Sequence, residues 1–421
     1  MTTRAFPMRN FTPPKAFRGD NDLAKKLYLL DPSKHLILGE PFPEEETPRA
    51  NYYRRYQYRH GMEGYFVMNK DDLAQHANVF GLTGTGKTTF LEEIVDQLRS
   101  EKMGKIPVLI INLAKENQHL KFGPDIVTKY GELGLQAPYI PTLPKDRGKL
   151  ESCLEHSSNN LVATMGFKHE IKRILPIVMM NWVNQKKKLP TSIKTLFRSL
   201  VDYIKKYKYA GNFQVNVLRT TYNRIKYIVK NKPLVQSLKY LPDIPWWFKK
   251  WMAGDMVFID LSPCDSVARQ LLTYSIFQLV RSYIPRDETN ELKYLIIIDE
   301  AHKILREPTS RDHNDVDYIT KNQTQAIIEE LLMEFRSMGV GMIIADQQPS
   351  SLMKCAYSLA SNRFLFRLNH PCYKLFSTNK DEWEAISRLE NRQLLAIVNG
   401  KDAAMNTIDK SDMFMMKLVE L

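Results

Sequence analysis

The stretch VFGLTGTGKTTF, residues 79–90, decides the fold of this chain. The apolar residues before it predict a strand, and the residues from Thr88 onward predict a helix. Between the two, Gly81, Gly84 and Gly86 let the backbone curl so that its N–H groups converge on an anion at a helix N-terminus. The spacing is the complete G-x-x-x-x-G-K-[ST] pattern, which predicts a site for a nucleoside triphosphate.

The side chains of this phosphate loop have distinct expected roles. Lys87 is placed to reach the β- and γ-phosphates, and the hydroxyl of Thr88 is placed to bind Mg²⁺. ATP and Mg²⁺ are therefore the expected cofactors. The other loop residues expected to contact the nucleotide are Gly81, Thr83, Gly84, Thr85, Gly86 and Thr89.

A second motif, YLIIIDEAH at residues 294–302, ends an apolar strand in two carboxylates. Asp299 is expected to hold Mg²⁺, and Glu300 to orient and deprotonate the attacking water, because phosphoryl transfer needs a neutralised charge and an aligned nucleophile. An acidic pair at a strand end can also be a helix cap, but the phosphate loop upstream favours catalysis. Helicases with the same DEAH letters carry a second ATPase lobe, for which residues 303–421 are too few.

The composition favours a polyanionic partner. The 421 residues carry 60 Lys and Arg against 47 Asp and Glu, a formal net charge of +13. Nucleic acid is the first candidate, and an acidic protein or a membrane surface is the alternative. We take the positive charge to be spread along the chain and expect binding without sequence preference, since no base-reading module is recognisable.

The four cysteines form no C-x-x-C pair, so we expect reduced thiols and no zinc site.

The sequence predicts a cytoplasmic protein without membrane insertion. Residues 1–20 alternate Arg, Pro and Phe and lack the apolar core of a secretory signal. The longest apolar runs, such as residues 294–298, fall well short of the ~20 residues that span a bilayer.

The order of the predicted elements indicates an α/β fold with an insertion. Residues 76–160 begin the core with strands and a helix, including a short strand at 137–143. Residues 161–250 have helical periodicity, and residues 251–421 return to strands and end in a C-terminal tail. Residues 1–75 form a Pro-rich N-terminal region. Several strands are continuous apolar runs, which is typical of parallel strands buried on both faces. We therefore expect a mainly parallel central sheet interrupted by a helical insertion.

Five motifs in series resemble the HerA/FtsK superfamily, most closely its HerA-like ATPases and their conjugative VirB-type relatives. They are HANVFGLTGTGKTT, PVLIINLAKEN, DMVFIDLS, LIIIDEAH and MEFRSMGVGMIIADQQPSSL, and the resemblance covers about residues 76–400. It implies a RecA-like P-loop NTPase core in a hexameric ring motor that translocates duplex DNA, often beside a nuclease. It also implies a fuller N-terminal β-barrel than residues 1–75 provide, so we expect the barrel to be reduced or replaced.

The resemblance assigns individual residues as well. The phosphate-loop and acidic residues of the family fall on those named above. The family pattern T-Q-R-P-S corresponds to DQQPS at residues 346–350, which makes Gln347 the polar sensor of the γ-phosphate. A family strand that ends in Asp-x-x-Gly-Glu corresponds to NLAKE, which retains Glu116 at the nucleotide but has Asn112 in place of the acid.

The charge that develops on the γ-phosphoryl group in the transition state requires a further cation. The phosphate-loop and acidic-pair segments contain no arginine, and the resemblance implies that a neighbouring subunit supplies one. Arg336, in EFRSMGVG, and Arg363, in SNRFLFRL, both correspond to basic positions of the family. Either one is the expected catalytic finger, and either could instead form a structural ion pair.

We therefore predict an ATPase, namely a Mg²⁺-dependent, homohexameric translocase of double-stranded DNA that works with a nuclease or another effector protein. Two alternatives remain open. One is a DNA-pumping ATPase of a conjugation or secretion apparatus. The other is a nucleotide-gated ring scaffold that activates a bound effector without moving DNA.

Overall fold

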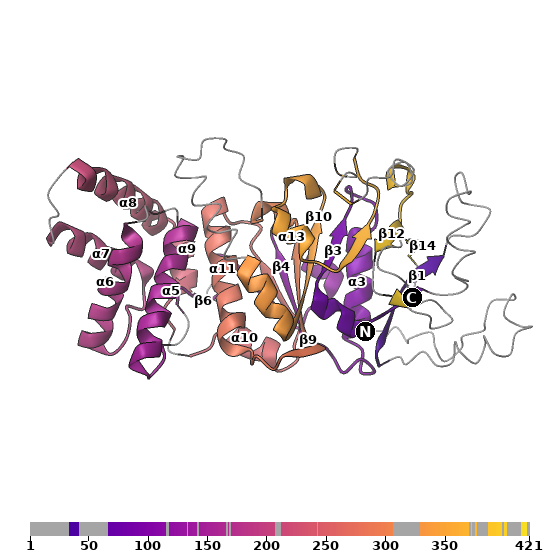
Figure 1. Ribbon diagram of the computed structural model, residues 1–421, viewed down its shortest axis with the longest axis horizontal. Helices are drawn as coiled ribbons and strands as arrows, with labels where there is room; N and C mark the ends of the chain where they lie inside the picture. The colour runs from indigo at the N-terminus through magenta and orange to yellow at the C-terminus, as the bar shows by residue number, and fades with distance from the viewer. Residues whose placement is uncertain are drawn as a thin grey trace, which may run out of the picture.

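A long mixed sheet forms the centre of the molecule (Figure 1). Its strands are β1 (His35–Pro41), β2 (Phe66–Asn69), β3 (Ala77–Phe80), β4 (Val108–Asn112), β5 (Ile126–Lys129), β8 (Val257–Asp260), β9 (Thr289–Asp299), β10 (Met338–Asp346), β11 (Asn362–Leu365), β12 (Gln393–Ile397), β13 (Gly400–Lys401) and β14 (Phe414–Lys417). They lie in the order β13-β2-β1-β14-β12-β11-β3-β10-β9-β4-β8-β5. The computed structural model describes residues 33–41, 66–114, 118–132, 134–140, 143–165, 167, 170–206, 212–241, 243–305, 329–369, 372, 375–376, 386–397, 400–401 and 414–418.

All neighbouring strands from β11 to β5 are parallel. Every residue of β3, β4, β8 and β10 is buried, as expected for apolar strands covered on both faces. The predicted mainly parallel central sheet is thereby confirmed. From β12 outward the sheet turns antiparallel, and there the described parts of the N-terminal region, β1 and β2, join it beside β14 and β13.

The strand order brings the predicted motifs together. β10 lies between β3, which leads into the phosphate loop, and β9, which ends in Asp299. Asp346, the last residue of β10, is in register with Phe80, and Ala345 is in register with Asp299. Since parallel strands end at the same edge of a sheet, the phosphate loop, the acidic pair and Gln347 meet at that edge.

At the opposite end of β3, His76 joins three segments of the core. Its Nε2 lies 2.8 Å from the carbonyl oxygen of Leu332, and its Nδ1 accepts the backbone N–H of Met342 at 3.1 Å. These two bonds require a neutral ring with its proton on Nε2. Burial lowers the pKa of His76 to about 4, which keeps the ring neutral. His76 is therefore a structural histidine of the sheet.

Helices cover the core sheet. They are α3 (Lys87–Leu98), α4 (His119–Phe122), α11 (Ser266–Tyr283) and α13 (Lys354–Ser358), with the 3-10 turns η4 (Lys70–Gln75), η5 (Ala301–Lys303) and η6 (Pro349–Ser351). α3 follows the phosphate loop directly and is hydrogen-bonded to β1 through Gln97. The side chain of Gln97 accepts the N–H of Ile37 at 2.7 Å and donates to the Ile37 carbonyl at 2.8 Å. Among the described residues, the structure has no helix that is both long and apolar enough to cross a membrane.

A lobe of helices extends from one end of the sheet (Figure 1). It contains α5 (Arg147–Met165), α6 (Ile171–Lys186), α7 (Ile193–Lys206), α8 (Asn212–Lys230) and α9 (Lys232–Ser237), with the paired strands β6 (Ala137–Pro138) and β7 (Leu238–Lys239). The short helix α10 (Trp246–Met252) lies beside the sheet, where Phe248 packs on Tyr283 of α11 and Trp251 packs on Tyr294 of β9. The residues with helical periodicity, 161–250, form mainly helices in the structure. The first helix of the lobe, α5, begins earlier than expected, at Arg147. In α7, Ile193, Leu196 and Leu200 are buried at helical spacing. Among the described residues of the stretch 137–143, two form a strand, Ala137 and Pro138, and Pro138 has no N–H to donate to a longer ladder.

Candidate active site

The phosphate loop connects β3 to α3 and requires glycine for two different reasons. Gly84 and Gly86 have φ values of 78° and 109°, which residues with a side chain rarely adopt. Gly81 is close-packed instead, since an added Cβ would lie 2.5 Å from the Cβ of Phe366. α3 begins at Lys87, directly after the loop, so the positive end of the helix faces the loop. No side chain caps this helix end. The loop therefore has the geometry of an anion site.

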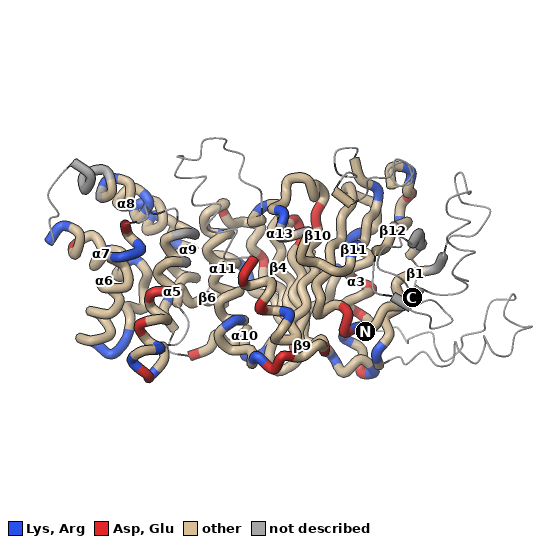
Figure 2. Tube along the Cα trace, viewed as in Figure 1, with Lys and Arg blue, Asp and Glu red and all other residues tan. Residues whose placement is uncertain are grey.

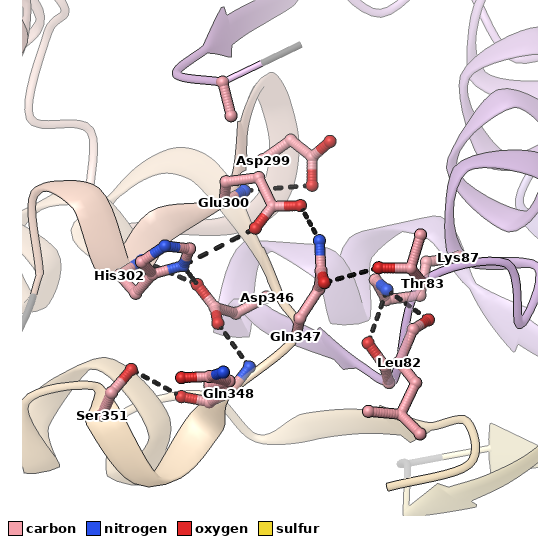
Figure 3. Close-up of polar contacts among 12 residues, drawn as sticks. Leu82, Thr83, Lys87, Asp299, Glu300, His302, Asp346, Gln347, Gln348 and Ser351 are labelled. Atoms are coloured by element: carbon pink, nitrogen blue, oxygen red, sulfur yellow. Dashed lines mark hydrogen bonds and ion pairs between the residues drawn. The ribbon is translucent and has the colours of Figure 1, made fainter.

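Two side chains of the loop are held by its own carbonyl oxygens. Lys87 is 6% exposed, and its Nζ donates to Gly81 O at 2.5 Å and to Leu82 O at 2.8 Å (Figure 3). The buried hydroxyl of Thr85 also donates to Leu82 O, at 2.8 Å. The side chain of Thr85 thus stabilises the loop from within, while Lys87 lies across it.

A cavity of about 520 Å³ opens beside the loop, a volume typical of small-molecule sites. Its lining residues are Thr83, Gly84, Gly86, Lys87, Thr88, Thr89, Gln118, Lys121, Asn391 and Arg392. Six of them belong to the phosphate loop and to the start of α3. The lining also brings three cationic side chains, Lys87, Lys121 and Arg392, around one space, which suits a polyphosphate.

The acidic pair lies at the end of β9, next to this cavity. Asp299 is 3% exposed, and its carboxylate accepts the side-chain N–H of Gln118 at 2.7 Å and the backbone N–H of Glu300 at 3.0 Å. Glu300 has a φ of 59°, a left-handed conformation that is unfavourable for a residue with a side chain. Such strain is typical of functional positions that the surrounding structure holds in place.

Gln347 connects the acidic pair to the phosphate loop. Its side-chain N–H donates to the carboxylate of Glu300, and its carbonyl oxygen accepts the hydroxyl hydrogen of Thr83 at 2.6 Å (Figure 3). One amide therefore contacts both halves of the site. This is the position expected of a group that responds to the γ-phosphate.

The oxygen ligands predicted for Mg²⁺ fit that ion. Thr88 lines the cavity, and Gln118, which lines it too, is hydrogen-bonded to Asp299. A hydroxyl and a carboxylate are the hard oxygen donors that Mg²⁺ prefers, and Mg²⁺ usually takes its other ligands from water and phosphate.

The two predicted finger arginines lie away from this cavity in their own subunit. Arg336 precedes β10 and donates to Gln75 O at 3.4 Å, at the end of the sheet opposite the phosphate loop. Arg363 is in register with Asn78, inside the sheet. Burial lowers the pKa of both guanidinium groups. Neither arginine lines its own cavity, and a role at a neighbouring subunit stays a prediction for both. Glu116 lies outside the described residues.

Several residues of the site were not found by sequence reasoning. Gln118 follows the NLAKE segment closely, so a wider reading of that motif could have included it. Asn391 and Arg392 precede β12 and have no motif around them. Their loop packs on the phosphate loop: the N–H of Arg392 donates to Thr85 O at 2.9 Å, and its guanidinium lies 3.7 Å from the carboxylate of Glu93.

Comparisons with known proteins identify the fold. No protein-family model matches the sequence, and no curated protein matches it either. Among solved structures, VirB4 of Thermoanaerobacter pseudethanolicus superposes with a TM-score of 0.62 at 11% identity, over 92% of this chain and 96% of that chain. The plasmid coupling protein TrwB in complex with ADP and Mg²⁺ superposes with a TM-score of 0.56 at 14% identity, over 84% and 87%. TrwB with the ATP analogue ADPNP gives a TM-score of 0.54 at 14% identity, over 83% and 86%.

These identities are low, so the similarity concerns the fold. It extends over 83–92% of this chain and 86–96% of those chains. The chain therefore has the RecA-like P-loop NTPase fold of VirB4 and TrwB, which is the fold implied by its resemblance to the HerA/FtsK superfamily.

Proposed function

We propose that this protein is a Mg²⁺-dependent ATPase that drives movement along double-stranded DNA as a homohexameric ring. The observation that carries the ATPase is the hydrogen-bonded chain from Thr83 through Gln347 to Glu300. It joins the loop that would bind the phosphates to the carboxylate that would activate water. TrwB, which shares the fold, has been seen with ADP and Mg²⁺ and with an ATP analogue.

Each group has a defined task in this reaction. The loop N–H groups and Lys87 bind the phosphates, and Thr88 and Asp299 hold Mg²⁺, which supplies charge neutralisation when bound. Glu300 accepts a proton from the attacking water, and Gln347 orients that carboxylate. Loss of the γ-phosphate would change the contacts of Gln347 with Thr83, which links hydrolysis to the position of β10.

The charge distribution supports DNA as the partner and corrects one expectation. The positive charge is not spread along the chain: residues 170–230 hold fourteen Lys and Arg against two Asp and Glu, nearly the whole excess of the protein. Those that the structure describes lie on α6–α8 or directly after α6, in the helical lobe (Figure 2). Such a concentration neutralises a phosphate backbone without reading bases.

A conjugation-type DNA-pumping ATPase is the second candidate function. Its support is the fold shared with VirB4 and with the conjugative coupling protein TrwB along most of each chain. The first candidate in its HerA-like form, with a nuclease as partner, rests on the sequence motifs alone. Both candidates require the same chemistry at the same residues, and they differ in the apparatus to which the ring attaches.

The ATPase is tested by two variants with different expected defects. Lys87→Ala removes the cation of the phosphate loop and should lose ATP binding. Glu300→Gln should bind ATP as the wild type does and lose turnover by about 10²-fold or more, because only the base is removed. Binding of a fluorescent ATP analogue and phosphate release measure the two effects. Wild-type ATP affinity in Lys87→Ala, or wild-type turnover in Glu300→Gln, contradicts the assignment.

A further inference from the structure

Asp346 is a fully buried carboxylate between the two turns that form the site. One of its oxygens accepts the backbone N–H of His302 at 2.6 Å and the Nδ1–H of the same histidine at 2.9 Å. The other oxygen accepts the backbone N–H of Gln348 at 2.7 Å. A buried charge is costly unless it is hydrogen-bonded, and these three donors meet that need.

These bonds join the segments that carry the reacting groups. His302 belongs to η5, the turn that directly follows Glu300 and its left-handed backbone. Gln348 directly follows Gln347. Through two backbone N–H groups, Asp346 thus fixes the turn of the general base relative to the turn of the sensor.

The imidazole of His302 extends the connection to the Glu300 carboxylate. Its Nδ1 lies 2.9 Å from Asp346 Oδ2 and 3.6 Å from Glu300 Oε2 (Figure 3). The hydrogen bond to Asp346, with the charges of Asp346 and Glu300, raises the pKa of His302. The ring thus lies between the two carboxylates, donates to Asp346 and lies close to Glu300.

The same three side chains could hold a metal ion, since their ligand atoms lie within 4.8 Å of one another. The hydrogen bonds favour a different role. Both oxygens of Asp346 already accept backbone N–H groups, which orients the carboxylate toward the protein. The family pattern T-Q-R-P-S has threonine where this chain has Asp346, so the buried charge distinguishes this chain from that pattern.

We propose that Asp346 and His302 are positioning residues that hold the Glu300 carboxylate and Gln347 in the arrangement needed for attack of water. This inference rests on the proposed ATPase function. It predicts that the pair acts through Glu300, affects turnover and leaves nucleotide binding unchanged.

The test compares His302→Ala and His302→Asn with the wild type in steady-state ATP hydrolysis. His302→Ala should lower kcat by about 10- to 100-fold with unchanged KM, because the base loses its orientation. The amide of asparagine can donate to Asp346 in place of the Nδ1–H, so His302→Asn should recover most of the rate. His156→Ala, a half-buried histidine of α5 that contacts Arg281, is the matched control and should keep the wild-type rate.

A double variant separates positioning from a merely structural effect. If His302 acts through Glu300, Glu300→Gln/His302→Ala should be as slow as Glu300→Gln and no slower in single-turnover measurements. Asp346→Asn should slow turnover at least as much as His302→Ala, provided that circular dichroism shows it folded. If it does not fold, the His302 variants decide.

A wild-type kcat in His302→Ala overturns the inference. So does a double variant in which His302→Ala slows Glu300→Gln by the same factor by which it slows the wild type. Either result leaves the proposed ATPase intact. A Glu300→Gln variant as fast as the wild type contradicts the ATPase assignment itself.

Discussion

Arg392 and Lys121 are the two cationic residues from outside the motifs that line the cavity of the same subunit. The Cα of Arg392 lies 3.2 Å from the position that a Cβ on Gly86 would occupy. The side chain of Arg392 lies near Glu93 of α3. A phosphate group in the cavity would compete with Glu93 for this guanidinium. We therefore expect Arg392 to bind the nucleotide in cis, in a role distinct from that of a finger supplied by a neighbour.

Arg392→Ala should raise the KM for ATP by about tenfold or more, the usual effect of losing a charge-assisted hydrogen bond. The change in kcat should be smaller. Arg286→Ala, which removes an exposed arginine paired with Glu334, is the control and should leave both constants unchanged. An unchanged KM in Arg392→Ala would remove this residue from the nucleotide site.

His76 makes the stability of the fold sensitive to acid. Its pKa is about 4 in the folded protein against an ordinary value of 6.5, so between these pH values the unfolded chain binds a proton that the folded one does not. The free energy of unfolding should fall as the pH drops from 6.5 toward 4, by about 3 kcal/mol in total from this group. Melting of wild type and His76→Gln at about pH 7.5 and about pH 5.5, on either side of the ordinary value, measures the effect. The variant should lose less stability on acidification, and an equal loss in both proteins would argue against a neutral His76.

At the scale of elements, sequence patterns predicted the strands, loops and helices that consecutive residues specify. The strand, loop and helix of residues 79–90 and the apolar strand before Asp299 are visible in the sequence, because each is specified by neighbouring residues. β5 was missed, since three of its four residues are at least partly exposed and the strand lacks an apolar run. The contribution of Asn391 and Arg392 to the cavity depends on how their loop packs, which no local pattern records.

The strand order explains why the motif residues meet. Gln347 reaches both Thr83 and Glu300 because β10 lies between β3 and β9. Periodicity predicts that β10 is a buried strand, but its neighbours follow from tertiary packing. The role proposed for Gln347 therefore came from the family resemblance, and the link from Asp346 to His302 came only from the structure.

The helices α7 and α8 should carry a measurable part of the DNA affinity. Replacing the exposed Lys205, Lys206 and Lys226 with glutamine should lower the slope of log affinity against log salt by about 0.9 for each phosphate that these lysines neutralise in the wild type. Replacing Lys34, Lys102 and Lys105, exposed residues of the core, changes the net charge equally and is the control. Equal effects of the two triple variants would mean that net charge, and not the helical lobe, sets the affinity.

At the scale of the whole molecule, the proposed reaction predicts that a second subunit completes the site. Removal of the finger, in Arg336→Ala or Arg363→Ala, should leave ATP affinity nearly intact and lower hydrolysis by about 10³-fold. Mixing that variant with Lys87→Ala should restore part of the activity, because some interfaces then combine an intact loop with an intact arginine. If neither arginine gives recovery in rings that demonstrably mix, the finger is another residue or the site is not shared.

The most direct measurement is displacement of a labelled third strand from duplex DNA, recorded together with phosphate release. An ATP-driven DNA motor should displace the strand only with ATP and Mg²⁺, from sites of any sequence. Glu300→Gln should bind the duplex and displace nothing. ATP hydrolysis by the wild type on the same duplex without displacement would contradict the motor and favour a nucleotide-gated scaffold.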